Sequence, residues 1–205
     1  MQYIAFLFSY LIGSIPSAVW IGKMFKGIDL RDYGSGNAGA TNSFRVLGWK
    51  LAIPVLILDV LKGLLAVSLY SLFDLSFFDE NLIKIILGLL AVFGHIYPIF
   101  AGFRGGKGVA TLLGVLIAIE PQSTGLAAIV FIIVFLITHI ISISSLISAL
   151  FLPFIFYFVS GDRFSLLNFV FFIFIALLLI YTHRKNIKRI FEGKESKIYF
   201  KKKDG

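Results

Sequence analysis

Two glycine-rich segments contain most of the residues in this chain that could do chemistry. Residues 34–42 read GSGNAGATN, and residues 102–108 read GFRGGKG. Glycines let successive backbone N–H groups point into one concavity, and Arg104 and Lys107 add full positive charge to those partial charges. Segments of this kind bind anions, so we take both as candidate anion sites.

The first segment satisfies the pattern G-x-G-x-x-G. No strand precedes it, however, and no acidic residue follows at the distance found in a βαβ unit, which argues against a dinucleotide site. Thr41 or Asn42 is expected to cap a short helix over residues 43–47 that stops at Gly48, with an anion favoured at its start. A tight re-entrant turn, rich in glycine only for packing, is the alternative.

The second segment resembles a Walker A motif but fails it. Gly108 follows Lys107 where Ser or Thr is required, and Ala101 occupies the place of the first glycine, so nucleotide triphosphate hydrolysis is not supported. Two cations among four glycines still describe a phosphate cradle, with Thr111 one helical turn further along. The alternative is a basic loop held at anionic lipid headgroups.

Three ionisable residues stand inside or at the end of apolar stretches. Asp59 and Lys62 are spaced i, i+3, and a bilayer tolerates them mainly as a mutually neutralising pair that faces the bundle interior, so we expect a supporting role. His95 precedes Pro98, which weakens a helix end. It could act as a base, but a hydrogen-bonded structural role is the more common one for such a histidine.

His183 and Asn186 also share one helix face, because they too are spaced i, i+3. They could point into a shared site. Alternatively, they belong to a basic amphipathic helix anchored at the membrane surface by Ile187, Ile190 and Phe191.

Composition predicts an integral membrane protein. Of the 205 residues 59% are hydrophobic and 15% charged, and the mean hydropathy is +0.95. The apolar stretches are too long for barrel strands, so we expect an all-α bundle of seven transmembrane helices forming a single domain over residues 1–205. The first stretch lacks signal-peptide features and counts as a span. The expected spans are Tyr3 to Gly22, Leu51 to Phe73, Leu82 to Phe100, Val109 to Glu120, Gly125 to Ile141, Ser144 to Ser160 and Ser165 to Thr182.

The distribution of charge predicts the orientation. Basic residues are retained on the cytoplasmic side, and they gather in alternate loops, which places the N-terminus outside and the C-terminus inside. Both glycine-rich segments are then re-entrant cytoplasmic loops, on the same side as Ser142 and the basic tail. The basic residues concerned are Lys23, Lys26, Arg31, Arg45, Lys50, Arg104, Lys107 and the set from Arg184 to Lys203; Asp74, Asp79, Glu80, Glu120 and Asp162 lie in the opposite loops. The end of the tail, residues 199–203, is expected to adhere to the anionic leaflet.

The chain contains no cysteine, which excludes disulfides, thiolate metal ligands and a catalytic thiol. No Ser-His-Asp arrangement is evident, and no H-x-x-x-x-D motif follows any histidine. No metal or cofactor is expected.

These motifs together resemble the bacterial acyl-phosphate:glycerol-3-phosphate acyltransferase family (PlsY), and the resemblance spans nearly the whole chain. It rests on Gly13-Ser14-Ile15-Pro16, residues 34–42, Asp59 with Lys62-Gly63, Gly94-His95 through Pro98, residues 105–111 and His183-Arg184-Lys185-Asn186. The family implies a seven-span bundle in the cell membrane with its active site at the cytoplasmic face. It also implies transfer of a fatty acyl group from acyl phosphate to the 1-hydroxyl of glycerol 3-phosphate, the first acylation of phospholipid synthesis.

The resemblance further implies roles for particular residues. Ser35, Gly36 and Asn37 would line the acyl-phosphate site, helped by Thr41 and Asn42. Arg45, Arg104 and Lys107 would hold phosphates together with Gly105, Gly106 and Gly108, and Ser142, His183, Asn186 and Lys194 would complete the pocket. Lysine is also found at the position of Arg104, and arginine can engage a phosphate with two hydrogen bonds. The soluble phosphate acyltransferase that makes acyl phosphate is the expected partner.

Acyl phosphate is already activated, so we expect direct attack without an acyl-enzyme. The general base is either His183 or the phosphate group of glycerol 3-phosphate. An anion transporter is the competing function, since broken helices and buried charges also build transport sites, but the basic loops lie on one side and no inverted repeat is visible. A lipid-binding scaffold would leave the two glycine-rich loops unexplained.

Overall fold

All regular secondary structure in the described part of the chain is helical. The computed structural model describes residues 2–73, 75 and 79–198, and over these ranges the backbone forms α-helices and short 3-10 helices without any strand. This confirms the all-α fold. The chain divides into two compact units, Met1–Pro121 and Gln122–Gly205, and each is described by itself. Asp74 and the basic run at 199–203 lie outside the described residues, and the single domain stays a prediction.

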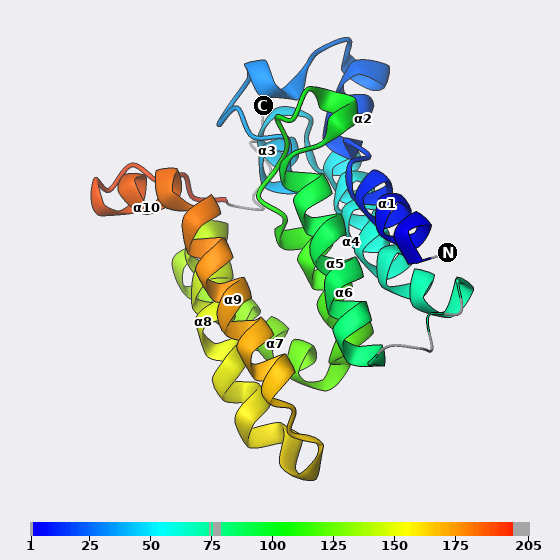
Figure 1. The fold of residues 1–205 in the computed structure, drawn as a ribbon. Coiled ribbons are helices and arrows are strands. Elements are labelled where there is room, and N and C mark those ends of the chain that lie inside the picture. The colour runs from blue at the N-terminus through cyan, green and yellow to red at the C-terminus, as the bar shows by residue number, and fades with distance from the viewer. Residues whose placement is uncertain (1, 74, 76–78, 199–205) are drawn as a thin grey trace. The chain divides into compact units, whose positions relative to one another are not determined.

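The first unit is a helical bundle organised around its longest helix, α4 (Figure 1). α4 contacts each of the other α-helices of this unit. The α-helices are α1 (Gln2–Gly13), α2 (Ser17–Lys26), α3 (Ala40–Val46), α4 (Trp49–Leu72), α5 (Glu80–Ile96) and α6 (Val109–Ile119), and the 3-10 helices are η1 (Leu30–Asp32) and η2 (Ile99–Ala101).

The first apolar stretch is a broken helix. α1 ends at Gly13, α2 begins at Ser17, and their axes are bent by 41°. Pro16 lies between them, and because proline has no N–H and clashes with the preceding turn, the helical hydrogen bonds are interrupted there. The predicted span from Tyr3 to Gly22 is thus a pair of helices bent at Pro16, and the break leaves the Ile15 carbonyl able to accept a bond from another helix.

α6 is short and packs closely on α4. A Cβ at Gly63 would collide with the Thr111 carbonyl, and one at Gly114 would collide with the Val60 carbonyl. Small residues at such contacts let two backbones approach, as is common between membrane helices. With 11 residues α6 is only about 16 Å long, which is shorter than a hydrocarbon core of about 30 Å.

The second unit is built from α7 (Pro121–Thr138), α8 (Ile141–Ser160), η3 (Gly161–Arg163), α9 (Leu166–Thr182) and α10 (Arg184–Phe191). Phe156 of α8 and Phe172 of α9 are fully buried and meet edge to face, with 5.0 Å between their ring centroids. The Ser148 hydroxyl donates to the Ala127 carbonyl at 2.6 Å and joins α8 to α7. At His183 the chain bends by 64°, so α10 leaves the direction of α9.

Each of the seven predicted stretches contains helix, with ends shifted by a few residues. By length and composition, four helices within the described ranges are able to cross a membrane, or up to six if each bent pair counts as one span. Val109–Ile119 is a further, shorter apolar helix. These helices support a polytopic membrane protein.

Candidate functional site

The first glycine-rich loop is organised around the side chain of Asn42. This side chain is buried on α3, where its Nδ2 donates to the carbonyls of Leu30 at 3.2 Å and Tyr33 at 3.0 Å. Its Oδ1 accepts the amide proton of Ser35 at 2.9 Å. The expectation that Thr41 or Asn42 caps α3 is wrong, because the helix starts earlier and Gly39 occupies the cap position without a side-chain bond.

Glycine is required at position 34 for two reasons. Gly34 has a φ of +62°, a conformation that residues with a side chain rarely adopt. A Cβ there would also collide with Oδ1 of Asn42. The turn that follows presents Ser35 and Gly36 as exposed residues and Asn37 as half-buried, so the predicted acyl-phosphate residues lie at the surface of the first unit.

The second glycine-rich loop runs back along the end of α5. The Gly105 amide donates to the Ile96 carbonyl and the Gly106 amide to the His95 carbonyl, each at 3.1 Å. The imidazole of His95 lies against Gly106, where a Cβ would collide with Nε2. The loop leaves Arg104 exposed and Lys107 half-buried, and it ends at Gly108, which caps α6 in the left-handed conformation.

Four amides of the two loops were expected to bind an anion, but they donate to acceptors within the protein. The amides of Ser35 and Gly36 donate to Asn42 Oδ1 and the Tyr33 carbonyl, and those of Gly105 and Gly106 donate to α5. An amide that is already donated to a buried acceptor does not cradle a phosphate, so the interpretation as a backbone anion nest is wrong for these four groups. Side chains of the loops are left as the main ligands for an anion.

A polar network lies beneath the second loop. Asp59 and Lys62 form a buried ion pair with 2.9 Å between Oδ1 and Nζ, as their spacing predicts. Ser17 donates to Asp59 Oδ1 at 3.1 Å, Lys62 donates to the Ile15 carbonyl at 3.1 Å, and His95 Nδ1 lies 3.6 Å from Asp59 Oδ1. The pair thus joins α4 to the helix break and to His95, which contacts Gly106.

This network borders a small polar cavity. Asp59 Oδ2 and His95 Nδ1 are buried and have no hydrogen-bond partner among the described residues. A small polar cavity with such groups suits a water molecule. The cavity is lined by Ile15, Pro16, Ser17, Ala38, Asp59, Lys62, His95, Pro98 and Gly105.

In the second unit, Glu195 accepts hydrogen bonds from two of the predicted site residues. Its Oε1 accepts from Ser142 Oγ at 2.9 Å and from Asn186 Nδ2 at 2.6 Å, and its Oε2 accepts from Arg189 Nε at 2.7 Å. Burial raises the pKa of Glu195, but the bonds from Arg189, Asn186 and Ser142 outweigh it and hold this pKa below its usual value. Sequence reasoning missed Glu195 and Arg189. The position of Glu195 within a basic stretch of the chain could have indicated that it forms such bonds.

His183 is buried at the junction of α9 and α10. Its Nδ1 lies 2.8 Å from the Leu179 carbonyl. Because a carbonyl only accepts, Nδ1 carries the proton of a neutral ring and Nε2 becomes the basic nitrogen. The Asn186 amide donates to the His183 carbonyl at 2.8 Å, so these two residues start the same helix, as their spacing predicts.

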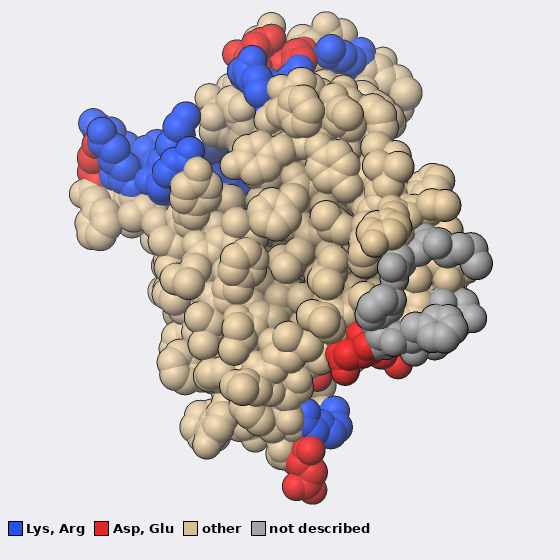
Figure 2. All heavy atoms as spheres, viewed as in Figure 1, with Lys and Arg blue, Asp and Glu red and all other residues tan. Residues whose placement is uncertain are grey.

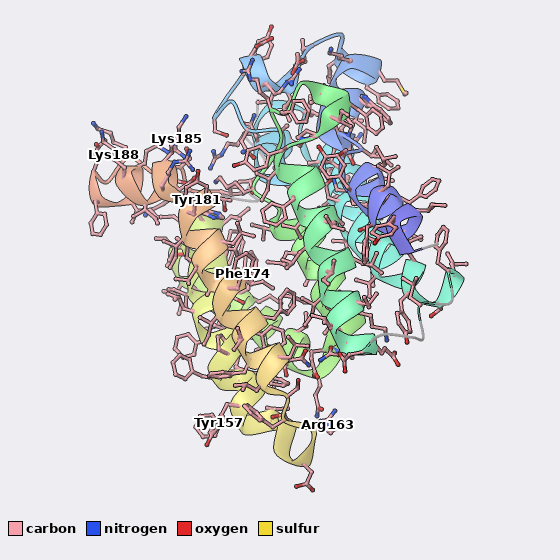
Figure 3. The ribbon with its side chains drawn as sticks, viewed as in Figure 1. Tyr157, Arg163, Phe174, Tyr181, Lys185 and Lys188 are labelled. Carbon is pink, nitrogen blue, oxygen red and sulfur yellow. The ribbon has the colours of Figure 1, made fainter. Side chains whose placement is uncertain are left out.

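Lys194 has a different environment from the Glu195 cluster. Its side chain is 73% exposed and pairs with Glu192 at 3.3 Å. Basic side chains gather over α10 (Figure 2). Figure 3 shows Lys185 and Lys188 along α10, and Arg163 at the opposite end of α9, so the second unit is charged mainly at one end.

Comparison with known proteins identifies the family. The family model described as glycerol-3-phosphate acyltransferase matches residues 3–193. The chain belongs to the glycerol-3-phosphate acyltransferase family. A glycerol-3-phosphate acyltransferase from Fusobacterium nucleatum is 46% identical over 192 residues, covering 94% of this chain and 95% of the relative. Another from Chlorobium phaeobacteroides is 39% identical over 221 residues, covering 94% of each chain.

Two solved structures of this acyltransferase family share the fold. Both are crystal structures of PlsY (YgiH), an integral membrane glycerol 3-phosphate acyltransferase. The glycerol 3-phosphate form has a TM-score of 0.85 at 37% identity and covers 97% of this chain and 96% of that one. The lysophosphatidic acid form has a TM-score of 0.82 at 36% identity, covering 97% and 95%. The family resemblance expected from the motifs is confirmed, and this acyltransferase is a multi-pass membrane protein.

Proposed function

We propose that this chain transfers a fatty acyl group from acyl phosphate to the 1-hydroxyl of sn-glycerol 3-phosphate, producing lysophosphatidic acid and inorganic phosphate. The hydroxyl oxygen bonds to the acyl carbon, the bond from that carbon to the phosphate oxygen breaks, and the hydroxyl proton goes to a base. The likeness to a glycerol 3-phosphate acyltransferase in its glycerol 3-phosphate form, over 97% of this chain, carries the proposal.

The choice of acyl phosphate as donor rests on the residues of the chain. It contains no cysteine for a thioester intermediate. In the described second unit, Ser142 donates to a carboxylate rather than to a histidine, so it is not activated as a nucleophile there. A donor whose leaving group is already phosphate needs no protein nucleophile, and positioning supplies much of the rate enhancement.

Eight of the predicted site residues receive a role in this proposal. Both substrates carry phosphate, so Arg45, Arg104 and Lys107 bind phosphate oxygens and stabilise the charge that develops on the leaving phosphate. Ser35 and Asn37 act through their side chains. His183 serves as the general base through Nε2, with Ser142 and Asn186 ordered by Glu195. The phosphate group of glycerol 3-phosphate is the alternative base.

The membrane arrangement is part of the same proposal. Counting both bent pairs and the short helix α6 gives seven spans, with the N-terminus outside the cell and the C-terminus in the cytoplasm. Support comes from the charge pattern, since basic residues follow α9 and acidic residues begin α5. The enzyme then works in the cell membrane and draws glycerol 3-phosphate from the cytoplasm, and a soluble enzyme that makes acyl phosphate is its partner.

Activity of the purified chain tests the proposal. We expect lysophosphatidic acid to form when the protein in detergent receives glycerol 3-phosphate and palmitoyl phosphate, and not when palmitoyl-CoA replaces the latter. Arg45→Ala and Lys107→Ala should lose activity while keeping the wild-type melting temperature, whereas Lys84→Gln, at the opposite end of α5 from His95, should stay active. Product from palmitoyl-CoA alone would overturn the donor assignment.

A transporter would behave differently in the same preparation. Reconstituted into liposomes, it would exchange labelled phosphate across the bilayer and form no new ester bond. Phosphate exchange without lysophosphatidic acid would replace the acyltransferase proposal with the transport function.

A further inference from the structure

The guanidinium of Arg31 joins the second glycine-rich loop to the segment that precedes the first one. Arg31 belongs to η1, shortly before the first loop, and its side chain is only 17% exposed. Its Nη1 donates to the Ala101 carbonyl at 2.5 Å and lies 3.5 Å from the Arg104 carbonyl. These carbonyls stand at the two ends of the turn that opens the second loop, so one cation contacts both ends of that turn.

Asp29 fixes the orientation of Arg31. Nε and Nη2 of Arg31 donate to the two carboxylate oxygens of Asp29 at 2.9 and 2.7 Å, which is the bidentate geometry of a strong charge-assisted pair. The same carboxylate also accepts the Arg31 amide at 3.1 Å and caps η1. The hydrogen bond from Arg31 holds the pKa of Asp29 well below its usual range, so the carboxylate stays charged at working pH.

The turn held by Arg31 has an unfavourable backbone conformation. Gly102 and Phe103 have φ values of +62° and +58°, and a bulky residue seldom adopts a positive φ without outside support. Arg104 and Lys107 follow directly, so their positions depend on this turn. The Phe103 amide donates to the Pro98 carbonyl at 2.8 Å, and Arg31 adds its hydrogen bond to the Ala101 carbonyl at the start of the turn.

The other end of the bridge reaches the first loop. Arg31 stands within η1, whose Leu30 carbonyl accepts from Nδ2 of Asn42, and Oδ1 of Asn42 accepts the Ser35 amide. Hydrogen bonds, together with the backbone link between Arg31 and Leu30, therefore connect Ala101 through Asn42 to Ser35, and all of these residues lie within the first unit.

We propose that Arg31 and Asp29 form a clamp that holds the two glycine-rich loops in one arrangement, and that Arg31 is a positioning residue for the phosphate-binding side chains. The guanidinium is occupied by backbone carbonyls and by Asp29, so it acts through Arg104 and Lys107 rather than on substrate. The catalytic part of this inference rests on the proposed function, whereas the structural part does not.

Hydrogen–deuterium exchange of the full-length protein in detergent tests the structural part. In Arg31→Gln and Asp29→Asn, we expect the amides of Gly105 and Gly106 to exchange about tenfold faster than in the wild type, because local opening governs exchange. Trypsin should also cleave faster after Arg104 and Lys107. Exchange in α4 should not change. Asp29→Asn keeps the cation and carries the test if Arg31→Gln does not fold.

Lys23→Gln is the matched control. Lys23 pairs with the same carboxylate at 3.5 Å, but its side chain is 59% exposed, so it contributes little to the clamp. We expect wild-type exchange and wild-type activity from this variant. Arg31→Lys should restore part of the protection, because lysine keeps the charge but lacks the planar fork that binds Asp29 and Ala101 together.

Kinetics test the catalytic part. For Arg31→Gln we expect kcat/KM for glycerol 3-phosphate to fall about 10- to 100-fold, as expected when binding groups are misplaced by about 1 Å. If activity falls but exchange of the loop does not change, Arg31 contacts substrate and the clamp is overturned. If the second loop exchanges faster in the variants but neither the variants nor the wild type has acyltransferase activity, the clamp stands and the proposed function fails.

Discussion

Asp59 and Lys62 form an ion pair inside the first unit, with 2.9 Å between Oδ1 and Nζ and almost no exposed side-chain surface. Each partner also bonds outside its own helix, Asp59 with Ser17 and Lys62 with the Ile15 carbonyl. Charged groups in a membrane-spanning segment are tolerated when they are paired and face the protein interior. The pair therefore secures the break between α1 and α2 against α4.

Removal of one member of this pair should destabilise the protein strongly. We expect Asp59→Asn or Lys62→Met alone to lower the free energy of unfolding by about 3–5 kcal/mol, because the remaining group is buried without full compensation. The double variant should lose less than the sum of the two losses. Thermal unfolding in detergent measures the effect, and strictly additive losses would show that the two residues are not coupled.

Asn42→Ala should loosen the first loop. The substitution leaves the Ser35 amide and two carbonyls without their partner, and an unsatisfied buried group costs about 1–3 kcal/mol. We expect a lower melting temperature and a higher KM for the acyl donor. Lys50→Gln, an exposed change at the start of α4, is the control and should match the wild type. If Asn42→Ala keeps the wild-type KM for the acyl donor, the order of the first loop does not affect donor binding.

The stability of the second unit should depend on pH through Glu195. Its pKa in the folded protein lies below the ordinary value of 4.5, so its contribution to stability is complete above about pH 4.5 and is lost as the pH falls through the lowered pKa. We expect the melting temperature of Glu195→Gln to change less between pH 7 and about pH 3 than that of the wild type. Glu192→Gln, which alters an exposed carboxylate, should keep the wild-type dependence.

His183→Gln should lower kcat for the formation of lysophosphatidic acid. If Nε2 of His183 takes the hydroxyl proton, its loss should cost about 10²- to 10⁴-fold in kcat. A kcat close to the wild-type value in His183→Gln would instead assign the proton transfer to the phosphate of glycerol 3-phosphate.

Much of the fold could be predicted because hydrophobicity is a local property of the chain. Stretches such as residues 51–73 are continuous and apolar, and the structure has helix there from Trp49 to Leu72. The residues at which the helices begin and end were less predictable. The start of α3 at Ala40, for example, depends on Asn42 bonding to η1 instead of capping its own helix.

The sequence by itself determined the fold class, the family and the residue types of the site. Glycines, cations and a histidine at fixed spacings could be read from the sequence, because charge and backbone freedom belong to the residues themselves. Only the tertiary structure decided what each group bonds to. Glu195 meets Ser142 from 53 residues away, and Arg31 reaches the Ala101 carbonyl across 70 residues. Hydrogen bonds require approach within about 3 Å, and such distances between remote residues exist only once the helices have packed.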